Sequence, residues 1–112
     1  MKAYCGKILR VDLSRRDVTA EGLDEAHLRD YLGQVGLAAR FLYDEVGPEV
    51  EPFSPGNRLI FMTGPLTGTA APASARYEVV AVSPQTAAYG EANSGGLFGP
   101  ELKFAGFDGI IF

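Results

Sequence analysis

The sequence predicts an α+β domain dominated by β-sheet. Strand-like segments open the chain, two helical patterns follow, and apolar strand-like segments return after residue 57. This order lacks the regular alternation of strand and helix that is typical of a doubly wound parallel sheet. A length of 112 residues and a hydrophobic content of 46% suit one small domain with its own core.

The first segments predict a β-hairpin at the N-terminus. Residues 7–13 alternate with period two, which is typical of a half-buried strand. One face carries Leu9, Val11 and Leu13, and the other carries Ile8, Arg10 and Asp12. Residues 14–17 form a polar turn, and residues 18–20 supply a short return strand.

A pair of short helices is expected next, joined by a glycine hinge. Asp24 can cap the first helix, and Gly33 ends it. The apolar spacing of a helix resumes after Gly36 and ends at residues 46–48.

Three further strands and one short helix complete the prediction. Residues 59–62 form a continuous apolar run that suits a strand covered on both faces, and residues 76–82 are rich in β-formers. Pro100 starts a helical segment over residues 100–105. Residues 108–112 have the character of a buried strand without a turn signal after it. We therefore expect its neighbour in the sheet to come from further sequence or from another chain.

Composition excludes several function classes. A net charge of -4 with scattered Lys and Arg argues against a nucleic-acid partner. No run of about 18 apolar residues is present, so we expect no membrane insertion. The single cysteine, Cys5, cannot form an internal disulfide or a Cys-x-x-Cys metal site, which suits a cytoplasmic location.

Two glycine-rich loops, residues 63–69 and 93–96, bracket the apolar strand that starts at Arg76. In the first loop, Gly64 and Gly68 let the backbone approach a ligand, and the threonine hydroxyls can donate to phosphate oxygens. The loop matches neither a Walker motif nor a Gly-x-Gly-x-x-Gly dinucleotide motif. An ordinary structural turn explains the same residues.

Arg76 and the second loop are the other candidates. A guanidinium at the start of a strand can bind phosphate through two hydrogen bonds, or it can form a surface ion pair with Glu78 or another carboxylate. Asn93 offers both donors and an acceptor to a heterocycle, and the glycines of residues 93–96 free backbone groups, although this is also a common turn sequence. His27 lacks metal-binding partners in the sequence, and Ser94 lacks a histidine base, so we predict no catalytic residue.

At these same positions the chain resembles the N-terminal domain of the tungsten-containing aldehyde ferredoxin oxidoreductase family. The resemblance runs along the whole chain in ordered segments, which are residues 6–13, 32–38, 52–57, 63–69, 76–77, 83–84, 93–96 and 99–108. Such a series is far more specific than either glycine-rich loop alone.

The resemblance implies a β-rich base for a bis-pterin cofactor that holds tungsten, with molybdenum as the alternative metal. It implies an enzyme that oxidises aldehydes to carboxylic acids and passes electrons through a 4Fe-4S cluster to ferredoxin. Arg76 and the segment Asn93, Ser94, Gly95 and Gly96 are then the pterin contacts. The backbone carbonyl of Asn93 is a ligand of a magnesium ion that bridges the pterin phosphates.

The resemblance covers only the front part of that domain, so residues 1–112 are expected to be a partial N-terminal domain, incomplete at the C-terminus. Cluster cysteines would come from downstream sequence or a partner chain. The 112 residues alone are therefore expected to be inactive. The complete enzyme would have ferredoxin as its partner, with a homodimer or a companion subunit as further partners.

Three positions depart from the family pattern. The family commonly has glycine and arginine where this chain has Gln34 and Val35, and often glycine where this chain has Ala75. The first departure can alter a contact near the cofactor or only the packing of a helix, and the second removes backbone freedom.

Two other functions stay open at this point. The chain can be a non-catalytic remnant that serves as an interaction module, associating through the sheet edge near residues 110–112. Another reaction of the same family, the reduction of a carboxylate or of an aromatic thioester, also fits the sequence.

Overall fold

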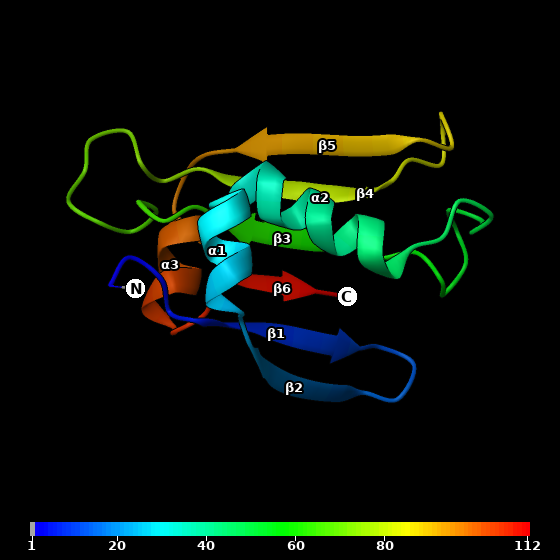
Figure 1. Ribbon diagram of the computed structural model, residues 1–112, viewed down its shortest axis with the longest axis horizontal. Coiled ribbons are helices and arrows are strands. Elements are labelled where there is room, and N and C mark those ends of the chain that lie inside the picture. Colours follow the sequence, from blue (N-terminus) through cyan, green and yellow to red (C-terminus); the bar gives the residue numbers. More distant parts are fainter. Residues whose placement is uncertain (1) are drawn as a thin grey trace.

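The computed structural model describes residues 2–112, which form one six-stranded sheet and three helices. The elements in chain order are β1 (Lys7–Asp12), β2 (Asp17–Gly22), α1 (Glu25–Tyr31), α2 (Gln34–Glu45), β3 (Ile60–Thr63), β4 (Tyr77–Val82), β5 (Tyr89–Ser94), α3 (Phe98–Phe104) and β6 (Gly109–Ile111). Figure 1 shows the sheet with α1 and α2 in front of it and α3 at one end. The predicted α+β class is confirmed.

The strand order is β2-β1-β6-β3-β4-β5. Strands β1 and β6 pair in parallel, and all other neighbours are antiparallel. The C-terminal strand therefore lies in the middle of the sheet, where Ile110 is opposite Leu9 on one side and Phe61 on the other. The expectation that β6 lacks a neighbour is wrong, and with it the idea of self-association through this edge. The open edges of the sheet are β2 and β5.

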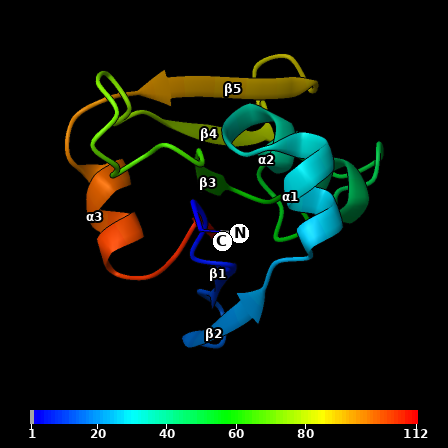
Figure 2. The ribbon, with the colours of Figure 1, turned by 60° about the vertical axis from the view of Figure 1, so that its left-hand side comes forward.

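Helices α1 and α2 cover one face of the sheet (Figure 2), and the core lies between them and the sheet. The fully buried side chain of β1 is Ile8, with 0% exposure, whereas Leu13 is 71% exposed. The face of β1 that packs against the helices is thus the one with Ile8, Arg10 and Asp12. Arg10 lies on the same side, two residues along the strand, and its guanidinium pairs with Glu21 at 2.7 Å and with Glu45 at 2.6 Å.

The helical pair is confirmed, with a shifted hinge. The Asp24 side chain accepts a hydrogen bond from the backbone N–H of Ala26 at 3.0 Å, as expected of an N-cap. Helix α2 already begins at Gln34, so Gly36 belongs to the helix and the hinge is at Gly33. A Cβ on Gly33 would lie 2.9 Å from the carbonyl oxygen of Thr63. A glycine is required there because the hinge packs directly on the backbone that follows β3.

The last third of the chain differs from the prediction at two elements. No strand is predicted over residues 89–92, and residues 93–96 are predicted to form a loop, yet β5 extends to Ser94 and pairs with β4 along its full length. Helix α3 begins at Phe98, two positions before Pro100, and the proline lies in its first turn, where a missing N–H costs nothing. None of the helices in residues 2–112 is long and apolar enough to cross a membrane.

Candidate anion-binding site

The two glycine-rich loops meet at one end of the sheet. Strands β3 and β5 end there and β4 begins there. In Figure 1 this is the left-hand end, with the arrowheads of β3 and β5 and the long loop between β3 and β4. The register places Tyr77 opposite Ser94 and Glu78 opposite Asn93. The residues singled out in the sequence are therefore neighbours across the β4–β5 pair.

Arg76 lies at this end with an exposed side chain. Its Nη1 donates to Oδ1 of Asn93 at 2.7 Å. Within residues 2–112 no carboxylate forms an ion pair with this guanidinium, whereas Arg10, Arg15, Arg40 and Arg58 all have one. The positive charge of Arg76 is thus solvated and available to an anion.

Asn93 separates Arg76 from the carboxylate that the sequence suggested as its ion-pair partner. The Nδ2 of Asn93 donates to Oε2 of Glu78 at 2.7 Å, and Glu78 is only 5% exposed. The direct Arg76–Glu78 pair is therefore wrong, because an amide lies between the two charges. The Asn93 side chain already has a partner at each end, which leaves one N–H and one lone pair for a heterocycle.

The backbone carbonyl of Asn93 points to the open edge of the sheet. Both backbone polar groups of Val82 bind the Asn57 side chain on the β3 side of β4, at 3.0 and 3.2 Å. Backbone groups of a strand alternate in direction, so those of Glu78 also point to the β3 side, and the opposed pair of Glu78 and Asn93 exchanges no ladder bonds. Since β5 is an edge strand, the Asn93 carbonyl faces outward.

The segment after Asn93 offers bare backbone. Ser94 is exposed at the end of β5, and Gly96 has a φ of +83°, a conformation that favours glycine. Among residues 2–112, none accepts a hydrogen bond from the backbone N–H of Gly95 or Gly96. A Cβ on Gly95 would lie 4.0 Å from Cγ of Arg76, so these amides are close to the arginine.

The first loop, in contrast, uses its own polar groups. The hydroxyls of Thr63, Thr67 and Thr69 donate to the carbonyl oxygens of Asp108, Arg76 and Leu66 at 2.7, 3.0 and 2.7 Å. None of the three is left as a donor to phosphate in this arrangement. Through the Thr67 hydroxyl, the loop instead holds the backbone carbonyl of Arg76.

A second side chain holds the same carbonyl of Arg76. Nε2 of Gln34 donates to it at 2.8 Å, beside the Thr67 hydroxyl. Gln34 has a φ of +44°, in the left-handed region, at the start of α2. The departure from the family pattern at Gln34 thus touches the backbone of a predicted site residue, while Val35 is exposed at 43% and Ala75 lies in the loop before β4.

A buried ion pair anchors the loop to the rest of the domain. Nζ of Lys103 lies 3.0 Å from Oδ1 of Asp108, and it also donates to the carbonyl oxygens of Ala3 and Gly64 at 2.8 and 3.2 Å. Asp108 accepts from the backbone N–H groups of Cys5 and Gly6. Sequence reasoning missed this cluster because the partners of Lys103 and Asp108 at Ala3, Cys5 and Gly6 lie 100 to 103 residues away and carry no spacing signal.

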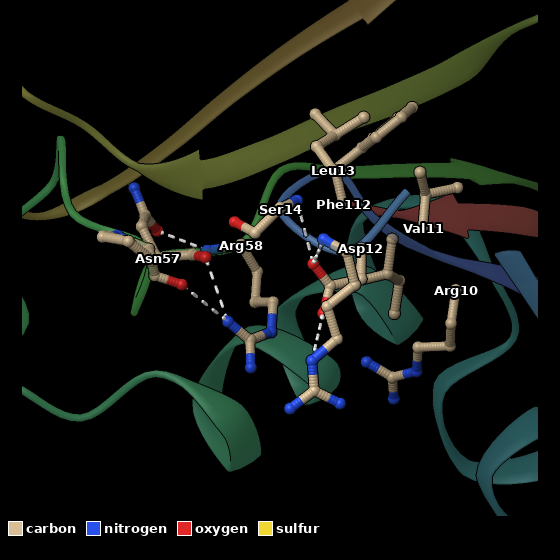
Figure 3. A pocket seen from close by; sticks show the side chains of 11 residues that line it. Arg10, Val11, Asp12, Leu13, Ser14, Asn57, Arg58 and Phe112 are labelled. Atoms are coloured by element: carbon tan, nitrogen blue, oxygen red, sulfur yellow. Dashed lines mark hydrogen bonds and ion pairs between the residues drawn. The ribbon is translucent and has the colours of Figure 1, made fainter. Parts of the chain in front are cut away.

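The opposite end of the sheet has a cavity of about 450 Å³ lined by Arg10, Asp12, Arg58 and Phe112 among others (Figure 3). The guanidinium groups of Arg10 and Arg58 already have hydrogen-bond partners there. Nη1 of Arg58 donates to the carbonyl oxygens of Pro55, Gly56 and Asn57, and Arg10 pairs with two glutamates. Within residues 2–112 no group of three or more His, Cys, Asp or Glu side chains can hold a metal. The end with Arg76 is the better anion site.

Comparisons with known proteins show the family to which the chain belongs. Residues 8–112 match the family model described as aldehyde ferredoxin oxidoreductase, N-terminal domain. The chain is 52% identical over 111 residues to the tungsten-containing aldehyde ferredoxin oxidoreductase of Pyrococcus horikoshii, covering 99% of this chain and 18% of that protein. It is 38% identical over 114 residues to the aliphatic sulfonate oxidoreductase, WOR-like subunit, of Pyrococcus furiosus, with the same two coverages.

A solved structure has the same fold. The active site complex BamBC of benzoyl coenzyme A reductase with 1,5-dienoyl-CoA superposes with a TM-score of 0.96 at 46% identity, covering 98% of this chain and 17% of that one. The chain thus spans less than a fifth of the length of the proteins that it matches. It belongs to the aldehyde ferredoxin oxidoreductase family, in the N-terminal domain.

Proposed function

We propose that residues 1–112 form the pterin-binding part of the N-terminal domain of a tungsten oxidoreductase that converts aldehydes to carboxylic acids. The observation that carries this proposal is the guanidinium of Arg76, which has a neutral amide as its partner and lies beside the unused backbone N–H groups of Gly95 and Gly96. The names of the relatives, which are tungsten-containing oxidoreductases, support the metal and the reaction class.

The residues at this end suit a phosphate-bearing pterin. Arg76 can bind phosphate oxygens through its remaining guanidinium N–H groups, and the amides of Gly95 and Gly96 together with the exposed Ser94 hydroxyl can add donors. The outward carbonyl of Asn93 is a hard oxygen ligand of the kind that Mg²⁺ prefers. When bound, the tungsten bis-pterin supplies a redox metal that takes up two electrons as an aldehyde becomes a carboxylic acid.

The electron path requires residues beyond this site. Cys5 is the single cysteine of the chain, so a 4Fe-4S cluster needs cysteines from further sequence or another chain. We propose that such a cluster passes the electrons to ferredoxin in the complete enzyme. A companion subunit fits the names of two matched proteins, one of which is a complex and the other a subunit.

Reduction of an aromatic thioester is the second candidate. The specific observation that favours it is the close match to benzoyl coenzyme A reductase, at 46% identity. The contacts proposed here bind the cofactor and not the substrate, so both reactions would use Arg76 and Asn93 in the same way. Assays with an aldehyde and with benzoyl-CoA, each coupled to a viologen dye, separate the two reactions.

The cofactor proposal is tested by Arg76→Ala in the polypeptide as its gene encodes it. Hydrogen bonds to charged groups contribute about 1.5 to 3 kcal/mol, so cofactor affinity should fall roughly tenfold or more. Tungsten and molybdenum are measured by elemental analysis, and pterin by fluorescence after oxidation. Arg29→Ala is the matched control, since Arg29 is exposed on α1 and makes none of the contacts described for the site. Equal metal and pterin content in the Arg76 and Arg29 variants would refute the assignment.

A further inference from the structure

Glu78 is a buried carboxylate that the cofactor contacts do not use. Only 5% of the residue is exposed, and its hydrogen-bond partner within residues 2–112 is Nδ2 of Asn93, at 2.7 Å. A carboxylate is costly to bury unless it is hydrogen-bonded or paired. The burial of this carboxylate opposite Asn93, on the neighbouring strand, therefore needs an explanation.

The three side chains form a chain in which each hydrogen bond has one allowed direction. A guanidinium only donates and a carboxylate only accepts. The Asn93 amide lies between them, so its oxygen must face Arg76 and its nitrogen must face Glu78, as the 2.7 Å contacts show. An amide alone can be turned end for end with little change in shape. Here the charge at each end selects one orientation.

The arrangement also keeps Arg76 free of a direct ion pair. Glu78 attracts the guanidinium across one amide, yet its carboxylate contacts Asn93 and does not take up the N–H groups of Arg76 in a salt bridge. Only Nη1 is used, and the remaining N–H groups stay available to a ligand. A carboxylate in direct contact would instead occupy these donors and neutralise the charge.

The backbone of Arg76 is held independently of this chain. Gln34 and Thr67 both donate to its carbonyl oxygen, at 2.8 and 3.0 Å. The backbone is therefore fixed from α2 and the first loop, and the guanidinium is fixed from β5. A change at Glu78 should act on the guanidinium and leave the backbone in place.

We propose that Glu78 is a positioning residue of the anion site, which orients the Asn93 amide and through it the Arg76 guanidinium toward a phosphate-bearing ligand. This inference rests on the proposed function, because it takes the anion at Arg76 to be a phosphate. It adds a residue that touches neither the ligand nor the reacting atoms.

The test uses Glu78→Gln, because glutamine keeps the volume and can still accept from Asn93. Glutamine can also donate, so one of the two constraints on the amide is lost, and a charge-assisted bond becomes a neutral one. The probe is inorganic pyrophosphate, titrated calorimetrically into the protein as its gene encodes it, produced without tungsten or molybdenum. We expect the Kd of Glu78→Gln to rise about fivefold. Glu91→Gln is the matched control, since Glu91 is exposed on β5 and its removal deletes the same charge.

A double-mutant cycle with Arg76→Ala separates positioning from a general structural effect. If Glu78 acts through Arg76, Glu78→Gln should add no further loss in the Arg76→Ala background. Additive losses would overturn the proposal, as would a Kd of Glu78→Gln equal to the wild type or lower than it. If Glu78→Gln fails to fold, Glu78→Asp replaces it, because the shorter side chain keeps the charge but withdraws it from Asn93. The same fivefold rise is expected for Glu78→Asp, and an unchanged Kd overturns the proposal.

The outcome for Arg76 alone reports on the underlying function. A wild-type protein that binds no pyrophosphate, or an Arg76→Ala variant with unchanged Kd, overturns the anion site and the inference together. A loss in Arg76→Ala without any loss in Glu78→Gln overturns the inference and leaves the proposed function standing.

Discussion

Replacing Asp108 with asparagine should release the N-terminal segment from the domain. The carboxylate is 2% exposed, and it accepts three hydrogen bonds, from Nζ of Lys103 and from the backbone N–H groups of Cys5 and Gly6. Asparagine keeps the size but removes the charge, so the ammonium group of Lys103, 8% exposed, loses its counter-ion. One oxygen also becomes an NH₂ group that faces a donor.

The magnitude follows from this burial. Removing one partner of a buried ion pair costs about 3 to 5 kcal/mol. The same change at an exposed pair costs far less, about 0.3 to 0.5 kcal/mol for residues four apart on a helix. Asp44→Asn is such a control, because Asp44 pairs with Arg40 at 2.8 Å and the two side chains are 37% and 36% exposed.

Hydrogen exchange measured by mass spectrometry reads this loss locally. A loss of about 3 kcal/mol corresponds to a roughly hundredfold faster exchange in the peptide that contains Cys5 and Gly6. Asp44→Asn should change exchange in α2 by about twofold. The double variant Lys103→Met with Asp108→Asn should exchange more slowly than Asp108→Asn alone, because no unpaired cation remains buried. Exchange of the Cys5 peptide within about threefold of wild type in Asp108→Asn would refute the reasoning.

Two further outcomes can be measured. Gly99→Ala should lower the free energy of unfolding by about 1 to 3 kcal/mol, measured by thermal unfolding. Its Cβ would lie 2.7 Å from the carbonyl oxygen of Ala75 and 3.0 Å from Cγ2 of Thr67. Gly22→Ala is the control and should be close to neutral, because a Cβ there has nothing within 4 Å. Burial, with the Asp108 carboxylate second, raises the pKa of the Cys5 thiol, against the smaller effects of Lys103 and Lys7. Less thiolate is then present at a given pH, so alkylation of Cys5 by iodoacetamide at about pH 8 should be slower than that of a cysteine peptide. The alkylation rate should still increase above about pH 9, and a rate that levels off below about pH 8.5 would contradict this.

The candidate site was predictable in its residue types and only partly in its contacts. Arg76 and the glycines after Asn93 stand out in the sequence because a guanidinium and bare backbone suit an anion, although a surface ion pair and an ordinary turn explain the same residues. That the Asn93 amide joins Arg76 to Glu78 was not predictable, since it depends on the register of β4 and β5. A strand over residues 89–94 would have been needed to place Asn93 opposite Glu78, and the polar residues there indicate a turn by local preference.

Local patterns determined the elements of this protein. Alternation in β1, the cap at Asp24 and the apolar run before Thr63 each have a physical cause within a few residues, so the sequence alone predicts the hairpin, the helical pair and the α+β class. The family resemblance, too, lies in ordered short motifs that the sequence shows directly.

Only the tertiary structure decided which elements became neighbours. The sequence predicts that residues 108–112 form a buried strand whose neighbour comes from outside the chain, yet β6 lies between β1 and β3, because pairing across about a hundred residues depends on the packing of the whole sheet on α1 and α2. The same long-range packing turned the threonines of the first loop inward and left the charge of Arg76 exposed. Hydrogen bonds between distant residues depend on where the chain returns, and no local pattern carries that information.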